Sequence, residues 1–281
     1  MLRVALPNKG QLAEPAREML REAGYPAAHG ARELVVLDPE NDVEFFFLRP
    51  RDIAIYVASG QLDIGITGLD LVLDSGVETE TLLELGFAPS TFRFAAPVGT
   101  ASSVADLAGK RIATSYAGLL STRLAELGIS ATIVKLDGAV ENSVRLGVAD
   151  AVADVVATGT TLKQAGLAVV GDPLLVSQAL LIQRTGAPTS HEVGTFVRRL
   201  HGVIMARAYV LVDYDIRADL VEKACAVTPG FESPTVSPLH DEGWVAVRAM
   251  VPRREIHRIM DDLYDMGARG ILVTDIHACR L

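Results

Sequence analysis

The sequence predicts an α/β protein of two similar lobes followed by a small domain with the element order βαββαβ. Three observations predict this class. Through most of the chain, short apolar strands alternate with helical stretches, which is the rhythm of an open, mostly parallel sheet. The segment GVADAVAD at 147–154 repeats the pattern of GQLDIGIT at 60–67, with a glycine and an aspartate before a short apolar strand. From residue 207 the rhythm changes to strand, helix, two strands, helix and strand.

The first lobe opens with an apolar strand and the loop PNKG. Its first helix ends at Gly24, because glycine readily adopts the left-handed conformation found at helix C-termini. The predicted elements of this lobe are strand 2–6, helix 12–23, strand 43–48, helix 53–59 and strand 63–67.

The second lobe repeats this order. Two such lobes leave a cleft between them, and open α/β sheets bind ligands outside the carboxyl ends of their strands. After the loop 185–190, Ser190 is expected to cap a helix over 191–200. The predicted elements of the second lobe are strand 110–114, helix 119–127, strand 131–136, helix 140–146, strand 151–157 and a helix starting at Leu162.

The last part of the chain has the element order of a ferredoxin-like domain. Pro252 opens the second helix of this domain and Gly267 closes it. The predicted elements are strand 207–214, helix 217–227, strands 235–238 and 245–251, helix 253–266 and strand 271–275.

Composition and charge limit the function classes. No segment approaches the ~18 apolar residues of a membrane helix, and the N-terminus lacks the apolar core of a signal peptide, so we expect a cytoplasmic protein. The net charge is −9 and no lysine- or arginine-rich run interrupts it, which argues against a nucleic-acid-binding surface. If the substrates are polyphosphates, their attraction must be local, from loop amides, a few arginines and a metal that travels with the phosphate.

The cysteines and histidines do not indicate a protein-built metal site. Cys225 and Cys279 stand outside any CxxC motif, and we expect both to be buried, reduced thiols. The six histidines include no pair at ligand spacing on one predicted helix, which argues against a zinc site.

The segment DVVATGTTL at 154–162 carries the strongest chemical signal. Its glycine allows successive N–H groups to point at one spot, its threonine hydroxyls add donors, and a helix N-terminus favours negative charge. These properties suit a phosphate dianion, although the spacing of a Walker A loop is absent. The alternative is a strand–turn–helix corner whose threonines cap the helix, and the spacing alone does not decide between the two.

Two carboxylates accompany this segment. Asp154 ends the strand before the loop, and Glu141 lies on the preceding predicted helix. Carboxylates accept hydrogen bonds from the diol of a ribose and stabilise positive charge at its anomeric carbon. Taken alone, Glu141 is better explained as a solvated helix residue.

Charged residues also follow the predicted strands of the first lobe. Lys9 in PNKG can meet a phosphate, Arg49 and Arg51 flank Pro50, and Asp70 follows a glycine turn. Each alone is better explained as a surface charge. All lie at predicted strand C-termini facing one cleft, which strengthens the joint interpretation as a binding site.

The run ENSVRLGVADAVADVVATGTTL at 141–162 resembles the signature of the ATP phosphoribosyltransferase family. The resemblance extends over nearly the whole chain through LPNKGQL, FFFLRPRDIAIYV, DIGITGLDL, LDGAVE and ESPTVSPL. The signature positions are Glu141, Gly147, Ala149, Val152, Asp154, Val155, Thr158, Gly159, Thr161 and Leu162.

The resemblance implies the long form of the family. The expected fold is two periplasmic-binding-protein-like (type II) α/β lobes that form the catalytic cleft, plus a C-terminal ferredoxin-like βαββαβ regulatory domain. Residues 1–90 and 180–206 would form lobe I, residues 91–179 lobe II with the loop for 5-phosphoribosyl 1-diphosphate (PRPP), and residues 207–281 the histidine-binding domain.

The implied reaction condenses ATP with PRPP to N1-(5-phosphoribosyl)-ATP and diphosphate, with Mg²⁺. It is the first step of L-histidine biosynthesis, with feedback inhibition by L-histidine and with AMP as a further inhibitor. Members of the family form dimers that associate into hexamers.

The resemblance also assigns site residues to this chain. PRPP would be held by Asp154, Ala157, Thr158, Gly159, Thr160 and Thr161, with Glu141 beside them. ATP would be bound by Lys9, Arg49, Asp70, Leu71 and Tyr116. L-histidine would be surrounded by Asp215, Phe231, Ser233, Thr235, Met250 and Gly270.

The regulatory assignment has a chemical rationale. Asp215 supplies a carboxylate for the ammonium group or ring of an amino acid, and Ser233 and Thr235 supply hydroxyls. From the residues alone, the simpler explanation is that these side chains end strands and cap the turn after Pro234.

The implied chemistry needs alignment and charge stabilisation more than proton transfer. N1 of adenine is a modest nucleophile, and the anomeric carbon of PRPP becomes cationic as diphosphate departs. We find no convincing general base. Our hypothesis for the catalytic residues is that Lys9 and Arg49 serve phosphate charge while Asp154 serves the ribose.

Two other function classes compete with this enzyme. One is a two-lobe protein that binds a small molecule without chemistry, and the other is a regulatory subunit with a catalytically silent cleft. The missing signal peptide argues against a secreted receptor, and the intact segment 154–161 argues against a silent cleft.

Overall fold

The computed structural model describes residues 1–25, 34–156 and 159–280. Contacts divide the chain into two compact units, Met1–Arg21 with Tyr25–Gly194 and Glu22–Gly24 with Thr195–Leu281. In the described ranges, no helix is long and apolar enough to cross a membrane.

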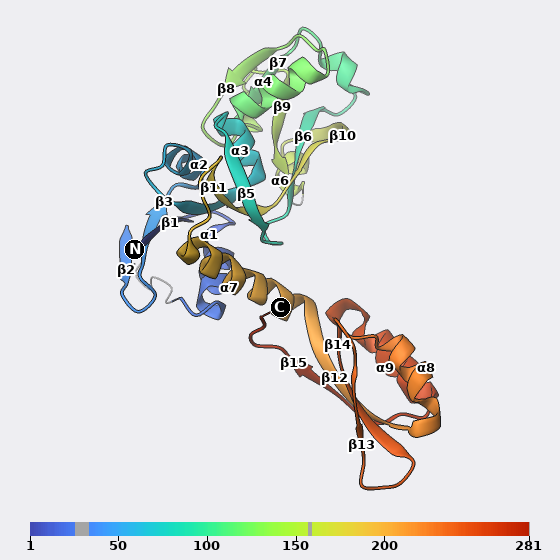
Figure 1. Ribbon diagram of the computed structural model, residues 1–281. Helices are drawn as coiled ribbons and strands as arrows, with labels where there is room; N and C mark the ends of the chain where they lie inside the picture. Colours follow the sequence, from blue (N-terminus) through green and yellow to red (C-terminus); the bar gives the residue numbers. More distant parts are fainter. Residues whose placement is uncertain (26–33, 157–158, 281) are drawn as a thin grey trace. The chain divides into compact units, whose positions relative to one another are not determined.

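Two mixed sheets build the larger unit, and we call the part around each sheet lobe I and lobe II (Figure 1). The lobe I sheet has the order β2 (Val35–Asp38), β3 (Val43–Leu48), β1 (Leu2–Pro7), β4 (Ile64–Gly68), β11 (Ala179–Arg184) and β5 (Thr79–Glu84). The lobe II sheet has the order β10 (Leu167–Ser177), β6 (Ser90–Pro97), β9 (Ala151–Val156), β7 (Arg111–Thr114) and β8 (Thr132–Lys135).

The two sheets share one topology. The order β3-β1-β4-β11-β5 in lobe I corresponds to β8-β7-β9-β6-β10 in lobe II. In each sheet the third of these strands, β4 or β9, is parallel to one neighbour and antiparallel to the other. Each of these two strands begins within one of the repeated sequence segments, 60–67 and 147–154. The sequence repeat therefore corresponds to a repeat of topology.

The chain crosses between the lobes twice. It passes from β5 to β6 through residues 85–89 and returns from β10 to β11 at Gln178. The expectation of mostly parallel sheets is wrong, because the returning strands run antiparallel to their neighbours.

Helices cover the sheets of the larger unit. Ile53, Ala54 and Val57 of α2 are fully buried, and they pack with Leu180 and Ile182 of β11. Pro50 starts α2 earlier than predicted, since proline fits the first turn of a helix. The helices are α1 (Ala13–Glu22), α2 (Pro50–Ala58), α3 (Leu69–Ser75), α4 (Ala117–Glu126), α5 (Asn142–Arg145) and α6 (Thr160–Gln164).

Helix α7 (His191–Ala208) is longer than predicted. The prediction ended this helix at residue 200 and began a strand at 207, but Arg207 lies in the last helical turn and β12 begins at Tyr209. The glycine inside the helix has a packing role. A Cβ added at Gly202 would lie under 3.0 Å from the backbone carbonyl oxygen of Cys279, so the C-terminal segment requires glycine there.

The smaller unit contains the βαββαβ domain that the sequence predicted. Its four strands pair antiparallel in the order β13-β14-β12-β15. The elements are β12 (Tyr209–Arg217), α8 (Val221–Val227), β13 (Thr235–Pro238), β14 (Trp244–Pro252), α9 (Ile256–Asp265) and β15 (Arg269–Asp275). With the two lobes of shared topology, this order confirms the predicted fold class.

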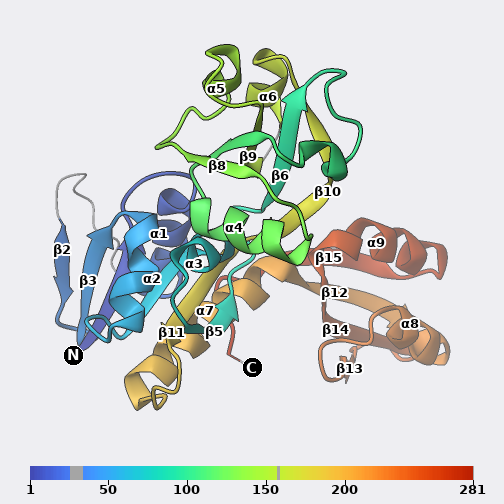
Figure 2. The same cartoon turned by 90° about the horizontal axis from the view of Figure 1, so that it is seen from above.

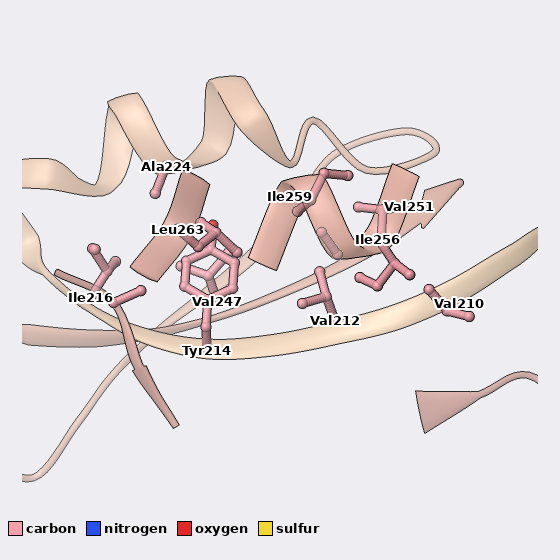
Figure 3. Close-up of a cluster of buried hydrophobic side chains, with 12 residues drawn as sticks. Val210, Val212, Tyr214, Ile216, Ala224, Val247, Val251, Ile256, Ile259 and Leu263 are labelled. Carbon is pink, nitrogen blue, oxygen red and sulfur yellow. The ribbon is translucent and has the colours of Figure 1, made fainter. Parts of the chain in front are cut away.

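The core of this domain lies between its sheet and its two helices (Figure 3). Alternate residues of β12 point into it, as expected for a strand with one buried face. The buried Tyr214 hydroxyl and the Thr228 hydroxyl form a hydrogen bond of 2.7 Å, which satisfies both polar groups. From α9, Ile259 and Leu263 complete the core.

We expect Leu263→Ala to destabilise this domain by about 2–5 kcal/mol, because it leaves a cavity under a side chain that is fully buried. Tyr264→Ala is the matched control, since Tyr264 is 74% exposed on the same helix and should change stability by no more than about 0.5 kcal/mol. Urea unfolding followed by fluorescence of Trp244, the single tryptophan, reports on this domain. Equal shifts for both variants would contradict the assigned packing.

Candidate active site

The carboxyl ends of strands from both lobes meet at one cavity of about 570 Å³. This volume lies in the range of small-molecule sites. We call it the large cavity. Its lining includes Lys9, Gln11, Leu12, Arg49, Arg51, Asp52, Asp70, Leu71, Ser90, Tyr116, Asp137, Asp154, Val155, Ser177 and Gln178.

A second cavity of about 300 Å³, the small cavity, adjoins the large one. Gln11, Asp154 and Val155 line both. The other residues of the small cavity are Glu141, Val156, Gly159, Thr161 and Leu162. Asp154 therefore stands at the boundary between two neighbouring ligand-sized spaces.

Burial raises the pKa of Asp154 to about 6. The negative charges of Glu141 and Asp70 contribute to this rise, while the N–H of Val155, which donates to Asp154 Oδ1 at 2.8 Å, and the positive charge of Arg51 oppose it. A carboxylate held in this way stabilises a positive charge that forms beside it.

Asp70 connects both lobes at the floor of the large cavity. The Ser177 hydroxyl donates to Asp70 Oδ1 at 2.7 Å and accepts the Asp70 N–H at 3.1 Å. Tyr116 of lobe II lines the same cavity, close enough for its hydroxyl to be influenced by the Asp70 charge. Burial, followed by the charges of Asp70 and Asp154, raises the pKa of Tyr116, so this phenol stays protonated and can donate.

The predicted phosphate loop leads from β9 into α6. Gly159, with φ of +73°, precedes the helix in the left-handed region, where glycine is favoured. Ala157 and Thr158 lie outside the described residues. Thr160 begins α6 and is exposed, whereas Thr161 lines the small cavity. Because α6 has only 5 residues, its macrodipole is small. A phosphate bound at this loop would therefore be attracted mainly by the loop amides.

The structure brings the predicted nucleotide residues together. All five line the large cavity, although they come from four separate segments of two lobes: the loops after β1 and β3 (Lys9, Arg49), helix α3 (Asp70, Leu71) and the start of α4 (Tyr116). Glu141, predicted inside a helix, instead precedes α5 and faces the small cavity together with Asp154. The roles of these residues stay predictions.

The predicted histidine residues lie in the smaller unit. Asp215 on β12, Thr235 on β13 and Met250 on β14 lie on the sheet face opposite the core. A Cβ at Gly270 would lie 3.6 Å from Asp215 Oδ2, so the two residues adjoin. Phe231 is half exposed and packs edge-on against Tyr209, with ring centroids 6.0 Å apart, and the Ser233 hydroxyl lies 3.4 Å from the Pro234 carbonyl oxygen.

Sequence analysis assigned no site role to several residues of the cleft. The Ser177 hydroxyl donates a hydrogen bond to Asp70, which lies 107 positions away in the sequence, and no local pattern indicates such a contact. Arg51 was noted only as a charge near Pro50, and it forms an ion pair with Asp74 of α3. Gln11 belongs to the run LPNKGQL, so the family resemblance could have drawn attention to it.

The residues that the structure describes include no cluster of three histidine, cysteine, aspartate or glutamate side chains suited to a metal ion. The donor set of the cleft instead combines cations with separated carboxylates. Such a set fits a divalent cation that keeps several waters and is held mainly by ligand phosphates.

Comparisons with known proteins show the family of the chain. The family model described as ATP phosphoribosyltransferase matches residues 49–202, and the model described as HisG, C-terminal domain, matches residues 206–278. The chain is 66% identical over 284 residues to the ATP phosphoribosyltransferase of Pseudarthrobacter chlorophenolicus and 61% identical over 285 residues to that of Streptomyces avermitilis, covering 100% of each chain in both cases. Among solved structures, the ATP phosphoribosyl transferase (HisG:HisZ) complex from Thermotoga maritima is similar with a TM-score of 0.64 and 26% identity, covering 73% of this chain and 98% of that one.

We expect Asp154→Asn to be more stable than the wild type at pH 7.5, by about 1–3 kcal/mol. The carboxyl titrates near 3.8 when unfolded and at about 6 when folded, so the folded state holds its proton more tightly. The free energy of unfolding therefore falls as the pH rises through this window, and asparagine avoids that loss. Urea unfolding of the wild type and the variant at pH 7.5 and pH 4 measures this difference in stability. A stability difference that is the same at both pH values would contradict the assigned cause.

Proposed function

Because the chain belongs to the ATP phosphoribosyltransferase family, we propose that it condenses ATP with PRPP to N1-(5-phosphoribosyl)-ATP and diphosphate, the first step of L-histidine biosynthesis. The observation that carries this proposal is the position of Asp154 between two adjoining cavities of different size. A transfer between two substrates needs two neighbouring sites whose reacting groups meet at one boundary.

We assign PRPP to the small cavity. Gly159 and Thr161 of the loop line it, and the loop amides with the threonine hydroxyls suit the ribose 5-phosphate. Asp154 and Glu141 then accept hydrogen bonds from the ribose hydroxyls. Ala157, Thr158 and Thr160 complete the proposed loop on the strength of the family resemblance.

We assign ATP to the large cavity. Lys9 and Arg49 follow β1 and β3 and meet its phosphates, while Leu71 and the ring of Tyr116 offer apolar surface to the base. The protonated Tyr116 and the buried Asp70 provide a fixed donor and acceptor. Local cations thus attract a polyphosphate in spite of the net charge of −9.

The reaction then depends on alignment and on charge. N1 of adenine carries a free lone pair, so no base is needed to create the nucleophile. As the bond from the anomeric carbon to diphosphate breaks, the ribose becomes cationic, and the ionised Asp154 stabilises this charge. Lys9 and Arg49 balance phosphate charge during the transfer. Mg²⁺, carried on the substrate phosphates, would supply further neutralisation of the leaving group.

We extend the proposal to regulation, assembly and location. L-histidine would bind around Asp215, Phe231, Ser233, Thr235, Met250 and Gly270, and AMP would compete for the large cavity as the reaction's nucleotide analogue. By linkage, inhibition requires that histidine bind one state of the enzyme better than another. We propose dimers that associate into hexamers, and a cytoplasmic enzyme supplied with ATP and PRPP.

A coupled assay for diphosphate release tests the proposed activity. We expect release only when ATP, PRPP and Mg²⁺ are all present, and we expect L-histidine to suppress it. Release that is absent under every condition would favour a silent binding protein. Release without response to histidine would remove the regulatory part of the proposal alone.

We expect Asp154→Asn to lower kcat by roughly 100-fold, because the charge beside the ribose is lost, and to change both KM values much less. Wild-type kcat should fall as the pH drops below about 6, where Asp154 takes up a proton, and the variant should lack this dependence. Asp172→Asn, an exposed carboxylate on β10, is the control. Unchanged kinetics with both substrates would exclude the role of Asp154.

We expect Asp215→Asn to raise the histidine concentration for half-inhibition by about tenfold or more, because a charge-assisted hydrogen bond is lost. Asp219→Asn, an exposed carboxylate close to it in sequence, should change this concentration by no more than about twofold. The measurement is diphosphate release titrated with L-histidine. Identical titrations for the two variants would place the inhibitor elsewhere.

A further inference from the structure

Helix α4 of lobe II does not cap its own N-terminus. The residue before it, Tyr116, makes no side-chain cap hydrogen bond. The first N–H groups of a helix need acceptors from outside the helix. Here they come from lobe I, because Asp74 Oδ1 on α3 accepts the N–H of Gly118 at 3.0 Å and the N–H of Leu119 at 3.2 Å.

The contact requires an unusually close approach of the two helices, which lie side by side in Figure 2. A Cβ added at Gly118 would lie under 3.0 Å from the backbone carbonyl oxygen of Asp74. A backbone atom cannot move aside as the end of a flexible side chain can. Position 118 therefore needs glycine for the two lobes to meet at this distance.

Asp74 has a second partner in lobe I. Its side chain is only 9% exposed and forms an ion pair with Arg51 of α2. The Arg51 guanidinium carbon in turn lies 4.9 Å from the centroid of the Tyr116 ring. One carboxylate thus joins α2 and α3 of lobe I to the start of α4 in lobe II, beside a ring that lines the large cavity.

We propose that Asp74 and Arg51 are positioning residues of the transferase cleft, and that the interlobe cap they form with the N–H groups of Gly118 and Leu119 sets the spacing of the lobes and the place of Tyr116. This inference rests on the proposed function and deepens it. Separation of α3 from α4 would leave two N–H groups without acceptors and a nearly buried carboxylate without its donors.

The functional consequence follows from where the substrates are held. The proposed ATP residues come from both lobes, since Lys9, Arg49 and Leu71 lie in lobe I and Tyr116 in lobe II. The proposed PRPP loop lies wholly in lobe II, between β9 and α6. Loss of the interlobe cap should therefore weaken ATP binding and slow transfer, while PRPP binding is kept.

Graded variants test this. Asp74→Asn keeps an oxygen for the two N–H groups but loses the charge opposite Arg51, whereas Asp74→Ala loses both. For the alanine variant we expect the ATP KM to rise and kcat to fall, each by about tenfold, with smaller changes for asparagine, because small misplacements strongly slow aligned reactions. The dissociation constant of PRPP, measured by calorimetry without ATP, should stay within about twofold.

Glu126→Gln is the matched control. It also replaces a carboxylate by an amide and breaks an ion pair, that of Glu126 with Arg123 at 2.6 Å, but at the far end of α4. We expect wild-type kinetics. Gly118→Ala is a second, independent variant, because it pushes the helices apart and removes no charge. It should give the same split between ATP and PRPP as Asp74→Ala.

Three outcomes would overturn the proposal. They are equal weakening of ATP and PRPP, unchanged values for both in Asp74→Ala, and a fall in melting temperature without any change in KM or kcat. If Asp74→Ala does not fold, the near-isosteric Asp74→Asn decides. If the wild type releases no diphosphate, the proposed function fails, and separate calorimetry of ATP and PRPP still supports or overturns the interlobe cap.

Discussion

Lobe I is completed by a strand that the chain reaches only after it has built lobe II. Strand β11 pairs antiparallel with β4 on one side and β5 on the other, and its Leu180 and Ile182 are buried against α2. This pairing forces the second crossing at Gln178 and places Ser177 against Asp70. The cleft depends on it, because the walls of the large cavity come from both lobes. In long-range pairing of this kind, the chain loses loop-closure entropy before the stabilising contacts form.

The charges of the cleft lower the stability of the folded protein but suit the proposed chemistry. The chain carries a net charge of −9, yet the proposed substrates are polyanions. Lys9, Arg49 and Arg51 concentrate positive charge where phosphates are expected, while burial and neighbouring carboxylates raise the pKa of Asp154. In the proposed reaction, a carboxylate that is unfavourable in the free enzyme would become favourable when a cationic ribose forms beside it. Perturbed pKa values of this kind are common at functional sites.

Sequence patterns predicted the elements with strong local signals and missed the others. The glycine stops and apolar runs placed β1, β3, β4, β7 and β9 within a residue or so of their observed bounds. The strands missed were β2, β5, β6, β10 and β11, most of which lie at sheet edges or beside the crossings. Their sequences lack the helix–strand alternation that guided the assignment, and short apolar runs are ambiguous by themselves. Helix α7 was ended too early, at residue 200, whereas the helix continues through Gly202, whose lack of a side chain allows close packing of the C-terminal segment.

By itself, the sequence determined the repeated helix–strand alternation of the two lobes, the βαββαβ domain, the family and several residues around the large cavity, because each of these is written in local periodicity or in a family motif. Only the tertiary structure decided that Asp154 borders two cavities, that Ser177 anchors Asp70, and that Asp74 caps a helix of the other lobe. The physical reason is that these contacts join residues far apart along the chain. Their geometry follows from how two lobes meet, and neighbouring residues carry no pattern that encodes it.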